Sequence, residues 1–186
     1  MKIGRLLLRL TLGGFFVGHG TQKLFGWFGG HGLEGTGQFF EQLELRPGRH
    51  HAVAAGAAET AGGALVFAGL ATPLAASTIT SVMLTAINRV HRKNGPWVTN
   101  GGYEYNVVLI AAAVALAEVG PGPLSLDEAL GTDLHGPGWA LAALLGGLAG
   151  AAGAHLYAQR SAPPAAPTVD PAAADAVAAG QPQPVV

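Results

Sequence analysis

Five stretches of the chain are predominantly apolar and long enough to form helices that cross a lipid bilayer, which takes about 20 such residues. They cover residues 5–28, 52–71, 73–90, 103–119 and 138–157. Thr72-Pro73, between the second and third stretches, is typical of an N-cap followed by proline at the first helical position, and it predicts an antiparallel hairpin. The pattern therefore predicts an all-α fold, a polytopic membrane helical bundle in which a four-helix core is followed by a fifth, C-terminal transmembrane helix.

The segments between the apolar stretches are rich in glycine, proline and polar residues and are expected to be loops. They are residues 29–51, 92–102 and 120–137. From Ser161 onward the chain consists largely of proline and alanine and has no aromatic residue, a composition typical of disorder. We therefore expect a four-helix membrane domain (residues 1–131), an additional transmembrane helix (132–160) and a disordered Pro/Ala-rich tail (161–186).

The composition favours a membrane protein and excludes several functional classes. Charged residues make up 11% of the chain, against about 25% in a typical soluble domain. Because the chain has no cysteine, it cannot carry a disulfide, an iron–sulfur cluster or a thiolate zinc site. The net charge of −1 gives no support for nucleic-acid binding. We expect a multi-pass protein of the plasma membrane whose first partner is the lipid bilayer.

Basic residues near the N-terminus leave two questions. Lys2, Arg5 and Arg9 precede an apolar run, as in a signal peptide, but no small-x-small cleavage site follows, so an uncleaved first span is favoured. These charges also favour a cytoplasmic N-terminus, whereas the larger number of basic residues at the opposite helix ends favours the reverse. The orientation in the membrane stays open.

If the helices alternate in direction, polar residues from four of them gather near one side of the membrane. At 1.5 Å per residue, His19 and Glu59 each lie about 10 Å from the same end of the bundle. Ionisable groups in hydrocarbon are costly, so they are expected to face the bundle interior and to pair. We expect Glu59 to lie near His19 or Lys23, and Glu104 near Arg89. The predicted polar pocket comprises His19, Gln22, Lys23, Glu59, Asn88, Arg89, His91, Glu104 and Tyr105.

Such a pocket could exchange protons, hold a small polar head group or bind the ring of a quinone. The same residues could instead serve only to lock the helices together. Haem ligation by His19 and His91 is disfavoured, because His91 lies at a helix end and not at the depth of His19. The sequence does not identify the cofactor; a quinone is one candidate.

Two further patterns have simpler interpretations. Histidines in the first loop, with a neighbouring carboxylate, show no recognised metal-ligand spacing and are expected to be solvated, so no metal site is predicted; these residues are His31, Glu34, His50 and His51. Gly14-x-x-x-Gly18 and Gly146-x-x-x-Gly150 match the motif for close helix packing, within the chain or with a partner subunit.

Several motifs together resemble the DoxX family of small bacterial and archaeal membrane proteins. The resemblance covers roughly residues 5–131 and rests on Gly18-His19-Gly20-x-Gln22-Lys23-Leu24-Phe25-Gly26, Phe28-Gly29-Gly30-x-Gly32, Gly35-Thr36, Glu59 before Gly62-Gly63, Gly69-Leu70-x-Thr72-Pro73-Leu74-Ala75-Ala76, His91, Gly101-Gly102-Tyr103-Glu104-Tyr105, and Gly120-Pro121-Gly122 with Leu124-Ser125-Leu126-Asp127. The resemblance implies a four-helix membrane core. Members are commonly labelled oxidoreductases, and the family name derives from a subunit associated with thiosulfate:quinone oxidoreductase and terminal oxidase systems. The fifth apolar segment and the tail depart from the family pattern.

The sequence thus predicts an accessory or quinone-facing subunit of a membrane redox assembly, with a soluble or membrane oxidoreductase as partner. In this interpretation His19 or Glu59 would carry protons, and Lys23 or Arg89 would hold a carbonyl or anionic oxygen. The electrons would come from the quinone or the partner, so the sequence does not decide whether the chain is itself an enzyme. A non-catalytic scaffold and a transporter of a small polar solute are the alternatives, although neither an interrupted helix nor an inverted repeat favours the transporter.

Overall fold

The computed structural model describes residues 3–132 and 134–161, and over these residues the secondary structure is helical, without strands. The five longest helices are α1 (Ile3–Phe25), α3 (Gly48–Ala68), α4 (Thr72–Ala86), α5 (Glu104–Val119) and α7 (Pro137–Arg160). The shorter elements are η1 (Trp27–Gly29), α2 (Gly32–Gln42), η2 (Ile87–His91), η3 (Arg92–Asn94), η4 (Val98–Asn100) and α6 (Leu126–Leu130). The predicted all-α fold is confirmed. Residues 162–186 of the predicted disordered tail lie outside the described residues.

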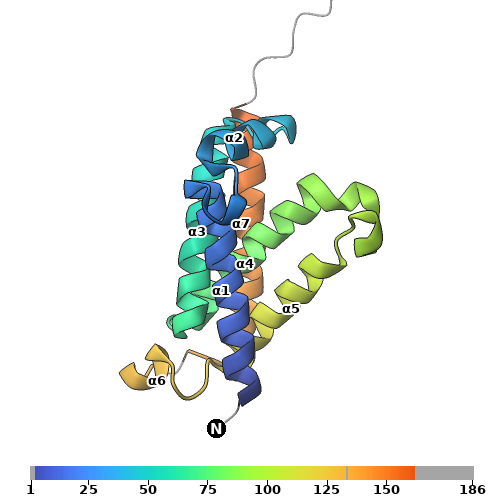
Figure 1. Ribbon diagram of the computed structural model, residues 1–186. Helices are drawn as coiled ribbons and strands as arrows, with labels where there is room; N and C mark the ends of the chain where they lie inside the picture. Colours follow the sequence, from blue (N-terminus) through green and yellow to red (C-terminus); the bar gives the residue numbers. More distant parts are fainter. Residues whose placement is uncertain (1–2, 133, 162–186) are drawn as a thin grey trace, which may run out of the picture.

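The long helices form a column and an arm (Figure 1). The column consists of α1, α3 and α7, which run nearly alongside one another. The arm is the segment from α4 through the turns η2–η4 to α5, and it leans away from the column toward its tip (Figure 1). Small and medium apolar side chains from α1, α3, α4, α5 and α7 form the buried core where the base of the arm meets the column.

The prediction of a loop over residues 29–51 is wrong, because this segment contains α2 and the first turn of α3. Glycines make this packing possible: a Cβ atom at Gly48 would collide with the carbonyl oxygen of Gly37. The N-terminus of α3 gains a further partner, since the Gly48 amide donates to a carboxylate oxygen of Glu41. The predicted loop 120–137 likewise contains a short helix, α6.

Glycines also set the two closest helix contacts. In α1, a Cβ atom at Gly13 or Gly20 would collide with the backbone of α3, so these helices touch backbone to backbone. Gly146 and Gly150 of α7 lie against the side chains of Ser77 and Ser81 of α4, which places that motif in a contact within the chain. By contrast, a Cβ atom at Gly14 or Gly18 would have no neighbour within 4 Å.

At the end of the column near the N-terminus, a buried aspartate and two arginines hold the connections. Asp127 accepts hydrogen bonds from the backbone amides of Ala71 and Thr72 and from the Thr72 hydroxyl. Arg5 and Arg9 donate to backbone carbonyls between α5 and α6. Asp127 is 2% exposed and so acts as an N-terminal cap of α4 supplied from a distant segment.

Of the described helices, α7 alone is both long and apolar enough to cross a membrane, judged by length and composition. The predicted spans 73–90 and 103–119 contain α4 and α5, which have 15 and 16 residues. Polar residues and glycines lower the hydropathy of α1 and α3. The multi-span architecture therefore stays a prediction.

Candidate functional site

A cavity of about 860 Å³ lies between the column and the arm. Ligand sites for drug-sized molecules have volumes of roughly 300–1,000 Å³, so this cavity has the size of a binding site. Its walls come from α1, α2, α3, α4, η2, α5 and α7. Leu12, Phe16 and Glu59 are buried among the lining residues, whereas His19 and Tyr105 are exposed and mark the mouth.

The column side of the cavity carries an ion pair between two helices. Lys23 Nζ of α1 lies 2.6 Å from Glu59 Oε2 of α3, and the Glu59 side chain is only 4% exposed. His19, one turn before Lys23, also lines the cavity, and its Nδ1 lies 3.0 Å from Gln22 Oε1. Lys23 is one of the two partners that the sequence predicted for Glu59. The pair is charge-neutral as a whole, and it borders apolar walls.

One face of α3 forms much of the cavity floor. His51, Ala55 and Glu59 follow one another at intervals of four residues, so they share this face. At 1.5 Å per residue, His51 and Glu59 are about 12 Å apart along the helix. The alanines between them keep the cavity open. The site therefore has two polar regions separated by an apolar stretch.

The second polar region forms where α4 changes its winding. Residues Ile87–His91 make a π-helical turn, η2. Such turns are rare in proteins, and those that occur often lie at functional sites. The turn places both Arg89 and His91 in the cavity lining. Arg89 Nη2 lies 2.6 Å from His155 Nδ1 of α7, and Nη1 donates to the Leu43 carbonyl at 3.4 Å. Arg89 thus joins α7 and the connection after α2 to the end of α4.

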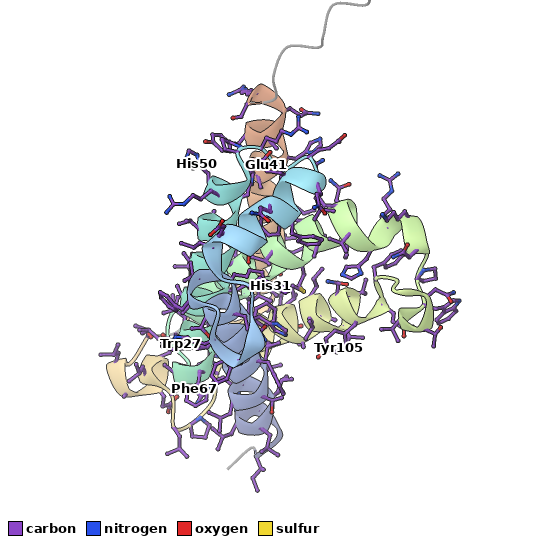
Figure 2. The ribbon with its side chains drawn as sticks, turned by 45° about the horizontal axis from the view of Figure 1, so that its top comes forward. Trp27, His31, Glu41, His50, Phe67 and Tyr105 are labelled. Carbon is purple, nitrogen blue, oxygen red and sulfur yellow. The ribbon has the colours of Figure 1, made fainter. Side chains whose placement is uncertain are left out.

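The arm contributes the remaining polar groups. Tyr105 and Asn106, in the first turn of α5, line the cavity. The buried Asn106 amide donates to Met83 Sδ at 3.4 Å. Figure 2 shows Tyr105 on the arm, while Glu41 and His50 lie at the far end of the column, where α2 meets α3. The cavity therefore combines side chains that are far apart in the sequence.

The nine predicted pocket residues divide into those that line this cavity and those that do not. His19, Lys23, Glu59, Arg89, His91 and Tyr105 line it. Asn88 lines a smaller neighbouring cavity, and Gln22 lies behind His19, where it also donates to the Phe28 carbonyl at 3.3 Å. Glu104 lines neither cavity. Its predicted pairing with Arg89 is wrong, since the carboxylate beside Arg89 belongs to Glu44, 3.9 Å away.

Sequence reasoning missed the contribution of α2 and of His51. Phe39, Phe40 and Leu43 of the α2 region line the cavity, but they were assigned to a loop. His51 was expected to be solvated, yet it is 7% exposed and its ring lies 5.4 Å from that of Tyr157. The eight-residue spacing from His51 to Glu59, about two helical turns, was the available signal. Among the described residues, no group of three or more histidine and carboxylate side chains is placed to hold a metal ion.

Comparisons with known proteins agree on one family. The DoxX family model matches residues 4–92. The protein named "Putative oxidoreductase CatD" of Bacillus subtilis (strain 168) is 36% identical over 126 residues, which are 68% of this chain and 86% of that protein. No solved structure matches the chain.

Proposed function

This chain belongs to the DoxX family, and from that premise we propose that it is a multi-pass membrane protein that binds a quinone in the cavity between column and arm. In this proposal it serves as an accessory, quinone-facing subunit of a membrane redox assembly. The name of its Bacillus relative, an oxidoreductase, supports the redox role. The observation that carries the proposal is the ion pair of the buried Glu59 with the partly exposed Lys23 at the wall of a large, mainly apolar cavity.

The outer surface supports the placement in a membrane. Large apolar side chains of α1, α4 and α7 that do not line the cavity are more than half exposed, among them Leu7, Leu74 and Leu141. Water-soluble monomers rarely expose contiguous apolar patches above a few hundred Å². In α7, Trp139 and Tyr157 are about 27 Å apart at 1.5 Å per residue. This separation is close to the thickness of the hydrocarbon core, at whose borders Trp and Tyr are enriched.

The polar groups of the cavity match the needs of a quinone. Reduction of a quinone takes up two electrons and two protons, and the electrons come from the partner oxidoreductase, since this chain has no thiol. His19 and Glu59 hold and pass protons, with the exposed His19 connecting the buried carboxylate to the mouth. Lys23 or Arg89 donates to a carbonyl oxygen. The apolar walls hold the ring and the tail.

Quinone titration of the purified protein in detergent tests the proposal. We expect Glu59→Gln to weaken binding of a short-chain benzoquinone or naphthoquinone by at least about tenfold, as for loss of a charge-assisted hydrogen-bond network. Glu118→Gln is the matched control, because it makes the same change at an exposed residue near the C-terminus of α5 that does not line the cavity. Equal quinone affinity in the two variants would contradict the proposal.

One observation favours a purely structural role instead. The Lys23–Glu59 pair bridges α1 and α3, so it could act only as interhelical glue. A scaffold of this kind predicts that Glu59→Gln lowers thermal stability while the surviving fraction supports full activity of the partner oxidoreductase. Titration and activity on the same preparation separate the two roles.

A further inference from the structure

A second cavity, of about 250 Å³, lies between the end of α4 and α7, and it shares Leu45, Thr85 and Arg89 with the lining of the large cavity. Its polar lining comes from Asn88, Arg89 and His155, and its apolar lining includes Leu84 and Leu148. Two of these residues belong to α7, which lies outside the residues matched by the family model. The cavity is therefore a feature of this chain that the family assignment does not cover.

The polar end of this cavity carries a positive charge with little compensation. Arg89 is 13% exposed, whereas its nearest carboxylate, Glu44, is 3.9 Å away and 84% exposed, which leaves that contact largely screened by water. The Arg89 Nε–H is buried and has no acceptor among the described residues. Because a guanidinium can only donate, His155 accepts from Arg89 through Nδ1, which leaves the Nε2–H of the ring as a second donor. These groups are complementary to an anion that offers several acceptor oxygens.

The apolar end continues onto the outer face of α7. Leu141, Leu145 and Leu148 are each about half exposed and follow one another at helical spacing, so they form one stripe leading to the cavity. His155 lies about 10 Å beyond Leu148 along the helix and two residues before Tyr157. The cavity therefore has its polar end at the depth where Tyr157 would meet the membrane interface.

We infer that this cavity binds an acidic phospholipid. The phosphate oxygens accept hydrogen bonds from Arg89, His155 and Asn88, and one acyl chain descends past Leu84 and Leu148 along the leucine stripe. Basic pockets between membrane helices are known to recognise acidic head groups. The inference rests on the proposed membrane placement of α4 and α7, but it does not depend on quinone binding.

Native mass spectrometry of the full chain in detergent, with phosphatidylglycerol or phosphatidylcholine added, tests the inference. We expect preferential retention of phosphatidylglycerol, and we expect Arg89→Gln to weaken it about fivefold, the effect of one basic residue on an acidic head group. Arg92→Gln is the control, because it removes the same charge from an exposed residue that lines neither cavity. Equal retention of phosphatidylglycerol by these two variants, or no preference over phosphatidylcholine, would overturn the inference.

His155→Phe keeps the test decisive if Arg89→Gln does not fold, and it too is expected to lower phosphatidylglycerol retention. Inorganic phosphate distinguishes the source of the anion: displacement of the lipid by millimolar phosphate would assign the site to a free anion and overturn the lipid assignment.

Quinone titration of the same samples separates the two proposals. If the unmodified chain shows no preference for phosphatidylglycerol but keeps Glu59-dependent quinone binding, this inference alone is removed, and the reverse result removes only the proposed function.

Discussion

At the scale of single residues, the Lys23–Glu59 contact is the clearest link between sequence and chemistry. We expect Lys23→Met to lower the thermal stability of the protein in detergent, because it leaves the carboxylate of Glu59, which is 4% exposed, without its counter-ion. The double variant Lys23→Met/Glu59→Gln removes both charges and should recover part of the loss. Unfolding temperatures of the four proteins in this cycle measure the coupling. A double variant as unstable as the sum of the two single variants would show that the pair is uncoupled.

Asp127 is the second residue whose loss has a defined consequence. It satisfies backbone amides at the start of α4 and also accepts from the Thr132 hydroxyl, so Asp127→Ala should destabilise the protein by about 2 kcal/mol, the upper range for loss of a helix cap. Hydrogen exchange at Ala71 and Thr72 should accelerate as the cap is lost. The exposed neighbour provides the control, since Glu128→Ala removes an acidic side chain without a capping bond. Unchanged exchange at these two amides would contradict the assigned role.

The sequence predicted residue contacts only where both partners lie on regular helices. Glu59 and Lys23 could be matched because α1 and α3 are antiparallel and the rise per residue is constant. The contacts of Arg89 could not be predicted, because a π-helical turn changes the direction of its side chain and its acceptors come from the connection after α2 and from α7. Three of the nine predicted pocket residues, Gln22, Asn88 and Glu104, accordingly lie outside the cavity lining.

At the scale of helices, two adjacent glycines of α1 give opposite predictions for the same change. Gly13→Ala should destabilise the protein, because the new Cβ atom would lie 2.5–2.8 Å from backbone atoms of α3, which has no flexible side chain there to move aside. Gly14→Ala meets open space and should stabilise the helix by up to about 1 kcal/mol. Thermal unfolding in detergent compares the two. Destabilisation by both would mean that Gly14 packs against a partner.

The long helices were predictable from the length of the apolar stretches, whereas α2 and the turns of the arm were not. The α2 sequence contains Gly32, Gly35 and Gly37, which disfavour an isolated helix, so its formation depends on packing against α3. The angle between the arm and the column could not be predicted either, because a hydropathy pattern gives the length of a helix but not its tilt. For this reason the sequence predicted a closed bundle with a polar pocket and not the large cavity that separates column and arm.

At the scale of the whole molecule, alanines make up about half of the buried core, while many large apolar side chains lie on the outside. Ala52, Ala75 and Ala113 are completely buried, but Leu7 and Leu74 are more than half exposed. In water this arrangement would forfeit most of the hydrophobic free energy that large side chains gain on burial. In lipid it is favourable, because close packing of small residues holds the helices together and the large side chains face the acyl chains.

The absence of cysteine from the chain makes the membrane arrangement directly testable. Lys93, in the tip of the arm, and Glu128, in α6, lie beyond opposite ends of α4, so single cysteines there should react with a membrane-impermeant maleimide from opposite sides of sealed vesicles. A cysteine at Leu145, halfway along the exposed face of α7, should react with neither side, because lipid surrounds it. The unmodified chain supplies the background. Labelling of positions 93 and 128 from the same side would show that α4 does not cross the bilayer, and the cavity behind it would then open to water and not to the quinone pool.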